Sequence, residues 1–335
     1  MRFPFRAALL LLLATLLCGC GKGTRTRLIF HSGLAADEVF RIDNLVCTKQ
    51  EMLVYLANAD NQYAKSLGAL QAGMPDGESD AFSDVIREST LALASQIKAM
   101  RLLADDMGVT YEEGDTDRAA AAAGAYYASL TEADLQVLDG VTQDTIRAMY
   151  LDVALANRVY AYTIRDVNPE ISDDEARTIT VEQIVVYKGT DAEAAREKIA
   201  EAAERIAAGE DFANVLPDYN EADTARVSFG YGMGGGIPEE EAFALNTGET
   251  GGILETEEAC YLLRCVSSFD REKTRANKAL IVEQRRHEAF GTVYDAFIAD
   301  LPVQLNEKAW DALEIPKNSG STTTQFWKIY DEFFN

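Results

Sequence analysis

Thr178-Ile179-Thr180-Val181-Glu182-Gln183-Ile184-Val185-Val186 is the stretch that decides the fold at the centre of this chain. Its β-branched residues predict a strand. Because side chains alternate along a strand, residues 179, 181, 183 and 185 share one face. Gln183 therefore sits among apolar neighbours, and it needs hydrogen-bond partners if it is buried.

A helix and a second strand follow this run. Residues 192–208 form an amphipathic pattern whose stripe includes Ile199, Ala202 and Ile206, and Gly209 suits the left-handed cap that ends a helix. Residues 260–266 are again strand-like. The order strand, helix, loop and strand indicates an α+β domain with an antiparallel sheet.

Two short motifs connect this pattern to a known family. They are Gly209-Glu210-Asp211-Phe212 and Phe243-Ala244-Leu245-Asn246-Thr247-Gly248-Glu249. In this order and spacing the region resembles the parvulin-type peptidylprolyl isomerase domain. The rest of the chain resembles the substrate-holding body of SurA/PrsA-type extracytoplasmic foldases. The resemblance implies an α+β protein in which a mostly helical chaperone body, similar to that of SurA and trigger factor, carries an inserted parvulin-like domain.

The resemblance also marks catalytic positions, and their residues are changed. The family uses two histidines and a cysteine or aspartate. Gln183 and Cys260 stand at the two histidine positions, and Ala222, with Asp223 next to it, stands at the third. Prolyl isomerisation must lower a barrier of ~20 kcal/mol by binding the twisted peptide bond best. These substitutions favour a degenerate domain that binds peptides, and they leave open an active isomerase with a variant catalytic floor.

A glycine-rich loop follows at residues 229–238. No helix opens directly from it and no Lys-Ser/Thr pair follows, so a nucleotide site is a poor interpretation. In the family the equivalent loop borders the proline pocket, where glycines allow a substrate backbone to approach closely. We expect Phe229, Met233, Ile237 and Phe243 at the substrate pocket, with ordinary core packing as the alternative for each.

The N-terminus is a targeting segment. Arg2 and Arg6 precede a short apolar run, and the Leu17-Cys18-Gly19-Cys20 sequence resembles a bacterial lipobox. This resemblance implies cleavage before Cys20 and acylation of its thiol. An ordinary signal peptide or an uncleaved anchor is the alternative. The prediction is a lipid-anchored protein on the outer face of the cytoplasmic membrane, in the bacterial cell envelope.

Composition excludes several classes of function. A formal net charge of −24 without a basic stripe excludes nucleic acid as a partner. Only two histidines occur and no CxxC motif, so we expect no metal and no cofactor. Cleavage would leave Cys47, Cys260 and Cys265, an odd number that allows no full disulfide framework. Cys260 and Cys265 point to opposite faces of their strand and should not bridge each other.

The predicted domains cover the whole chain. Thr48 and Glu51 have the spacing of a capping box, so a helix should begin there, and long helices are predicted at 142–165 and 271–301. The tail is aromatic, and it either docks on its own chain or contacts a partner or membrane. The segments are a signal peptide (1–19), tether (20–36), N-terminal helical chaperone domain (37–175), parvulin-like domain (176–269), returning C-terminal helix (270–316), and flexible linker with aromatic tail (317–335).

The preferred hypothesis is a membrane-anchored foldase that binds unfolded secreted polypeptides, including Xaa-Pro segments. An active peptidylprolyl isomerase is the second hypothesis, and an envelope lipoprotein without a client is the third. An enzyme should lose turnover on mutation at the pocket. A chaperone that only holds its clients should keep suppressing aggregation when the parvulin-like domain is deleted. No oligomeric state is predicted.

Overall fold

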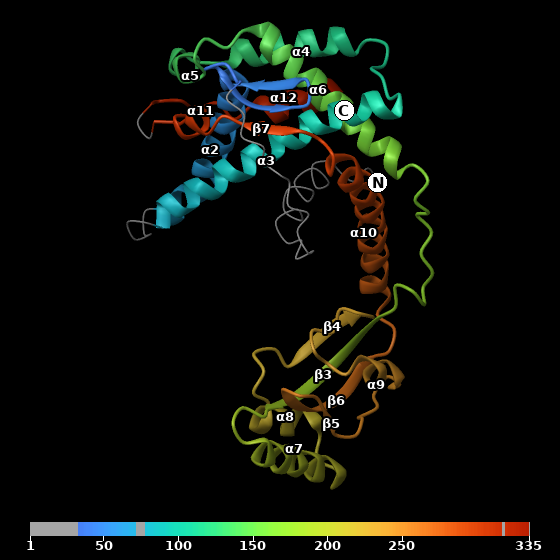
Figure 1. Cartoon of the computed structure of the whole chain (residues 1–335). Coiled ribbons are helices and arrows are strands. Elements are labelled where there is room, and N and C mark those ends of the chain that lie inside the picture. Colours follow the sequence, from blue (N-terminus) through green and yellow to red (C-terminus); the bar gives the residue numbers. More distant parts are fainter. Residues whose placement is uncertain (1–32, 72–77, 317–318, 335) are drawn as a thin grey trace. The chain divides into compact units, whose positions relative to one another are not determined.

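The computed structural model describes residues 33–71, 78–316 and 319–334, and the chain divides into two compact units (Figure 1). Met1–Arg165 and Ala289–Asn335 form one, which we call the helical unit. Asp166–Glu288 forms the other, the sheet unit. The sheet unit extends beyond the predicted limits of 176 and 269, because Thr274 Oγ1 accepts from the Thr178 amide (3.1 Å) and Asn277 Nδ2 donates to the Ala176 carbonyl (3.0 Å).

Most elements belong wholly to one unit. Those of the helical unit are β1 (Glu38–Ile42), β2 (Leu45–Thr48), α2 (Lys49–Gln71), α3 (Glu78–Met107), α4 (Asp115–Ser129), α5 (Glu132–Val137), α6 (Gln143–Ile164), β7 (Val303–Leu305), α11 (Glu307–Asp311) and α12 (Phe326–Phe334). Those of the sheet unit are β3 (Thr178–Tyr187), α7 (Ala192–Ala207), α8 (Phe212–Tyr219), β4 (Arg226–Gly230), α9 (Glu239–Ala244), β5 (Leu254–Glu255) and β6 (Ala259–Ser267). The helix α10 (Arg271–Ile298) begins in the sheet unit and ends in the helical unit.

Both separated segments are needed to build the helical unit. Its small antiparallel sheet has the order β2-β1-β7, so a strand from the C-terminal segment pairs with the first strand, with Phe40 opposite Leu305. The predicted capping box is confirmed at the start of α2. The Thr48 amide donates to Glu51 Oε2 (2.7 Å), and the Glu51 amide donates to Thr48 Oγ1 (3.3 Å).

A buried ion cluster joins three helices of this unit. Lys98 Nζ of α3 lies 2.7 Å from Glu51 Oε1 of α2 and 2.8 Å from Asp152 Oδ2 of α6. Arg101 Nη1 completes the cluster at 2.9 Å from Asp152 Oδ1. Because each buried charge is matched, removing one partner would leave an uncompensated charge, at a cost of about 3–5 kcal/mol.

The aromatic tail docks on its own chain. The side chain of Phe326 is fully buried; its ring stacks on Tyr150 with centroids 4.5 Å apart, and it meets Tyr55 and Tyr126 edge-on, each at 5.5 Å. The Phe326 amide donates to Asn58 Oδ1 (3.1 Å), and the Tyr150 hydroxyl donates to the Phe326 carbonyl (3.0 Å). Of the two alternatives for the tail, docking on its own chain is the one confirmed.

The prediction of a flexible linker before the tail is wrong for residues 321–323. One buried oxygen, Asp134 Oδ1 of α5, accepts from Ser321 Oγ (2.8 Å) and from the amides of Thr322 (2.8 Å) and Thr323 (3.0 Å). The other oxygen accepts from the amide and hydroxyl of Thr131, which caps α5. Residues 317 and 318 lie outside the described part of the chain. Polar composition suggested mobility, but here the polar groups are the donors that one carboxylate binds.

The sheet unit has an antiparallel sheet of order β4-β3-β6-β5, with β3 in its interior. Helices α7 and α8 cover one face (Figure 1), where Ile184, Val186, Cys260 and Leu262 pack against Ile199. The opposite face carries a second apolar cluster. Its buried members are Ile179, Val181, Val185, Phe229, Ala242, Ala259, Tyr261 and Leu263. We call this the pocket face, because the candidate site lies there.

The three cysteines among the described residues are free and buried. The expectation that Cys260 and Cys265 do not bridge each other is thus confirmed. Burial raises the pKa of the Cys47, Cys260 and Cys265 thiols. A raised pKa keeps a thiol protonated and unreactive at neutral pH, so these cysteines act as small apolar side chains.

Phe326→Ala should destabilise the helical unit by about 3–5 kcal/mol, because it leaves a cavity among three tyrosines. Urea unfolding measures the loss. Lys328→Ala on the exposed side of α12 is the matched control, and we expect a change below about 0.5 kcal/mol. A Phe326→Ala loss no larger than the control's would show that the tail does not stabilise the unit.

Asp134→Asn should weaken tail docking in a pH-dependent way. Burial alone would raise the pKa of Asp134, but the hydrogen bonds from Thr131, Thr322 and Ser321 prevail and lower it. Since the folded-state pKa is depressed, the stabilisation is present above the unfolded value of 3.8 and is lost as pH falls through the folded value. We expect a loss of about 3 kcal/mol at pH 7 that shrinks below about pH 4. A loss that does not vary with pH would contradict this role.

Candidate functional site

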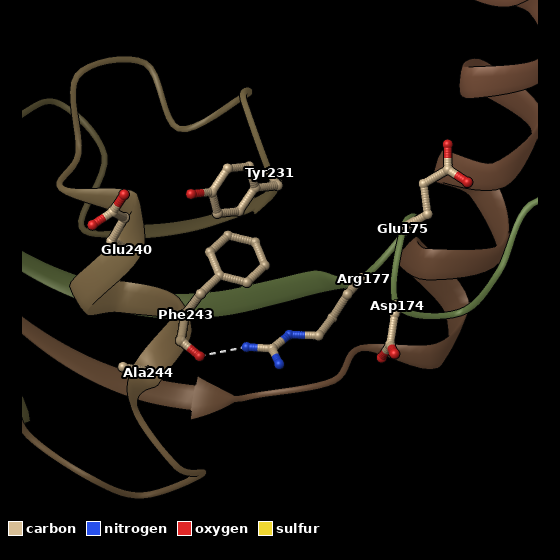
Figure 2. A pocket seen from close by; sticks show the side chains of 7 residues that line it. All are labelled: Asp174, Glu175, Arg177, Tyr231, Glu240, Phe243 and Ala244. Atoms are coloured by element: carbon tan, nitrogen blue, oxygen red, sulfur yellow. Dashed lines mark hydrogen bonds between the residues drawn. The ribbon is translucent and has the colours of Figure 1, made fainter.

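An open pocket of about 790 Å³ lies in the sheet unit (Figure 2). Its walls come from the turn before β3, the loop after β4, and helix α9. The lining residues are Asp174, Glu175, Arg177, Tyr231, Glu240, Phe243 and Ala244. The pocket thus combines two aromatic rings with three carboxylates and one guanidinium.

Three aromatic rings form a continuous chain from the core to the pocket. Phe229, buried at the end of β4, meets Phe243 edge-on at 5.8 Å between centroids. Phe243 in turn meets Tyr231 edge-on at 5.3 Å. Tyr231 is 62% exposed, so the chain ends in a ring that solvent reaches. An exposed aromatic ring supported by a half-buried ring and a buried one offers apolar area at little entropic cost, which suits the binding of apolar side chains.

Arg177 holds the floor of the pocket rather than facing an outside ligand. Its guanidinium donates to the Phe243 carbonyl at the end of α9 and lies 5.0 Å from the centre of the Phe243 ring (Figure 2). Its Nε is buried and has no hydrogen-bond partner in the described residues. The charge of Arg177 is therefore directed at α9 and the aromatic chain.

A carboxylate fixes the glycine-rich loop beside the pocket. Glu239, at the start of α9, accepts from the amides of Gly232 (2.6 Å) and Gly234 (2.5 Å). A side chain on Gly230 would meet Asn277 Nδ2 of α10 at 2.5 Å and would displace it from the Ala176 carbonyl, so a glycine suits the start of the loop. These contacts hold Tyr231 between two fixed points although its ring is exposed.

The predicted substrate-binding residues lie in or beside this pocket. Phe243 lines it and Phe229 supports it from below, as the aromatic contacts show. Ile237 is partly buried in the apolar cluster of the pocket face, and Met233 is 57% exposed on the loop, but neither is among the lining residues. Tyr231 and Arg177 were not among the predicted site residues. Tyr231 lies inside the glycine-rich stretch and could have been found there, whereas nothing in the sequence pattern places Arg177 beneath Phe243.

The four predicted catalytic positions do not meet at the pocket. Gln183 is buried; its Nε2 donates to the Thr224 carbonyl (2.8 Å), and its Oε1 has no partner among the described residues. Ala222 packs partly buried on the pocket face, and Asp223 is exposed. Cys260 is buried on the opposite face, against α7. The sheet therefore separates Cys260 from Gln183.

Gln183 also lies far from the aromatic pocket along strand β3. Gln183 lies four residues beyond Ile179, the partner of Phe229 in the β3–β4 register. At ~3.3 Å per residue this is ~13 Å along the sheet. The residue of β6 opposite Gln183 is the apolar Leu263, and Tyr261 and Cys265 flank Leu263 on the same face, opposite Val185 and Val181. Among the described residues of β3 and β6, this face thus offers the Gln183 amide, the Tyr261 phenol and the Cys265 thiol, and no imidazole.

Metal-binding clusters and membrane-spanning helices are both absent from the described residues. The described residues contain no group of three or more His, Cys, Asp or Glu side chains that could hold a metal ion. None of the described helices has both the length and the apolar character needed to cross a bilayer. The predicted lipidation residue Cys20 lies outside the described part of the chain.

Comparison with known proteins finds likeness in structure only. No protein-family model matches this sequence, and no curated protein matches it. The similar solved structures include PrsA foldase proteins from several bacteria. PrsA from Bacillus subtilis is 14% identical, with a TM-score of 0.26 over 84% of this chain and 94% of that one.

Two other solved structures give similar values. The peptidylprolyl isomerase PrsA from Bacillus cereus is 12% identical, with a TM-score of 0.38 over 75% of this chain and 93% of that one. Foldase protein PrsA from Streptococcus pneumoniae is 14% identical, with a TM-score of 0.31 over 91% and 98%.

Glu239→Ala should loosen the glycine-rich loop without unfolding the sheet unit. Loss of the carboxylate frees the Gly232 and Gly234 amides, so their hydrogen exchange should accelerate about tenfold or more, which corresponds to about 1.4 kcal/mol. Glu241→Ala, in the same helical turn but exposed, is the control and should leave exchange unchanged. Equal protection in both variants would mean that Glu239 does not fix the loop.

Proposed function

We propose that this protein is an extracytoplasmic foldase whose sheet unit binds apolar segments of unfolded polypeptides. The observation that carries the proposal is the open pocket ending in the exposed ring of Tyr231, which Phe243 and Phe229 support from the core. Pockets that bind peptides and small ligands are commonly aromatic with a few fixed polar groups. The resemblance of residues 209–212 and 243–249 to parvulin motifs supports the same assignment.

The distribution of exposed apolar side chains supports the sheet unit as the binding part. Six of the nine large hydrophobic side chains that are most exposed among the described residues belong to residues 166–288. They are Tyr187, Tyr231, Met233, Ile253, Phe269 and Leu280. The three in the helical unit, Val85, Tyr111 and Tyr162, lie far apart in the sequence. The helical unit, by contrast, uses its aromatic rings internally to hold its own tail.

The geometry favours peptide binding over catalysis of proline isomerisation. A catalyst needs polar groups at the twisted bond, where they bind the transition state better than the ground state. Gln183 lies ~13 Å along the strand from the aromatic chain, and Cys260 is on the other face of the sheet. The pocket therefore offers an apolar surface for a proline ring, but Gln183 and Cys260 do not lie beside that surface.

We further propose a location in the bacterial cell envelope, with a lipid anchor at Cys20. The sequence of the first twenty residues supports this, since charged, apolar and small residues precede the cysteine in the expected order. Acyl chains would hold the protein at the membrane with ~0.8 kcal/mol for each buried CH₂. Its clients would then be secreted chains that emerge unfolded at that membrane.

Tyr231→Ala should weaken the binding of a fluorescent peptide with a Phe-Pro core by about 5- to 30-fold. This corresponds to loss of one aromatic contact of about 1–2 kcal/mol. Tyr187→Ala is the matched control, because Tyr187 is also exposed but does not line the pocket. Fluorescence anisotropy with the full chain gives both affinities.

Prolyl isomerase turnover, measured on the same preparations with Xaa-Pro peptides, separates the two hypotheses. We expect turnover at background in the wild type and in both variants. Turnover above background that falls in Tyr231→Ala would make the protein an enzyme. Equal peptide affinity in wild type, Tyr231→Ala and Tyr187→Ala would contradict the assignment of the pocket.

A further inference from the structure

We propose that the pocket selects apolar segments that carry a lysine or arginine next to the apolar residue. This inference rests on the proposed function and names the class of segment that the same site prefers. It comes from the positions of the charged groups around the aromatic rings and from which of these groups already form ion pairs.

Carboxylates stand on two sides of the aromatic centre. Figure 2 shows Glu240 to one side of Phe243 and Tyr231, and Asp174 and Glu175 to the other. They come from different elements: Glu240 from the first turn of α9, and the other two from the turn that precedes β3. A peptide whose apolar residue lies on Tyr231 and Phe243 would therefore have a carboxylate near it in either direction along its chain.

Two of these carboxylates are available to a ligand. Neither Asp174 nor Glu240 forms an ion pair with another described residue, and both are exposed. Glu175 differs, because Arg285 of α10 pairs with it. The neighbouring Asp173 is likewise paired, with Lys278 Nζ at 2.7 Å. Lys278 and Arg285 therefore neutralise Asp173 and Glu175, whereas Asp174 and Glu240 have no cation as a partner among the described residues.

The one cation that lines the pocket does not cancel this charge. One N–H of Arg177 donates to the Phe243 carbonyl and the guanidinium lies against the Phe243 ring, so this cation is held against α9. An acidic peptide would need that guanidinium free for a bidentate contact. A basic peptide needs no rearrangement, since its cation meets the free carboxylates and the exposed face of Tyr231, where a cation–π contact adds to the attraction.

The charge of the whole chain acts in the same direction. With a formal net charge of −24, the field around the protein attracts basic segments and repels acidic ones at low ionic strength. This general field is screened within about 8 Å at physiological salt, whereas contacts with Asp174 and Glu240 act at short range. Local selectivity should therefore persist at a salt concentration that removes the general attraction.

The test uses three nine-residue peptides with one Phe-Pro core flanked on both sides by Lys, Gln or Glu. Fluorescence anisotropy with the full chain gives their affinities at 0.15 M salt. We expect the Lys peptide to bind about tenfold more tightly than the Glu peptide, with the Gln peptide between them. The double variant Asp174→Asn with Glu240→Gln should reduce this ratio to about twofold.

Glu201→Gln is the matched control, because Glu201 is an exposed carboxylate on α7, which covers the opposite face of the sheet. It should leave the ratio unchanged. Equal binding of all three peptides would overturn the inference and leave the proposed function standing. Tighter binding of the Glu peptide would also overturn it, by showing that Arg177 is free. No binding of any peptide would overturn the inference together with the proposed function.

Discussion

The central strand β3 is buried on both faces and paired on both edges, and this constraint organises the sheet unit. Nine of its ten residues are buried or half-buried, and it pairs with β4 on one side and β6 on the other. Because its side chains alternate, the strand has to serve two separate apolar layers. One layer receives α7 and α8. The other is left for the glycine-rich loop and α9, and this is where an exposed aromatic pocket becomes possible.

The pocket depends on short polar contacts that hold the glycine-rich loop and the end of α9 in place. The Glu239 carboxylate fixes the glycine-rich loop by accepting from two of its amides. The Arg177 side chain fixes the end of α9 by donating to the Phe243 carbonyl. The helical unit uses the same principle at Asp134, where one carboxylate binds the segment that leads into α12. In both units a buried or half-buried carboxylate accepts hydrogen bonds from the backbone amides of an irregular segment, which has no regular helix or strand bonding of its own there. A carboxylate suits this purpose because it accepts several hydrogen bonds at once.

Much of the fold could be predicted from the sequence because it depends on local patterns. The run at 178–186, the capping box at Thr48 and Glu51, and the helical periodicity of α6 each predicted their element correctly. The residues that were missed depend on contacts across the chain. The pairing of β7 with β1 and the ion cluster at Lys98 join residues that are far apart in sequence. The flexible linker was predicted wrongly because its polar composition does not reveal that Asp134 will bind it.

The candidate site could be predicted only in part for the same reason. Phe229 and Phe243 were found because they stand in a glycine-rich stretch and a recognisable motif. The grouping of Gln183 with Cys260 came from motif position, and alternation along β6 places Cys260 on the opposite face. Register decides such questions, since a shift of one residue exchanges the two faces of a strand. The carboxylates around the pocket come from a turn and a helix start, which no local pattern brings together.

Photo-crosslinking can identify the residues that hold a bound polypeptide segment. A peptide with a Phe-Pro core and a photoreactive group on the phenylalanine is bound to the full chain, irradiated, and its attachment sites are mapped by mass spectrometry. We expect the attachments to concentrate at residues 229–244, around Tyr231 and Phe243. Attachments concentrated in the helical unit, with none at residues 229–244, would contradict the claim that the aromatic pocket binds polypeptide segments.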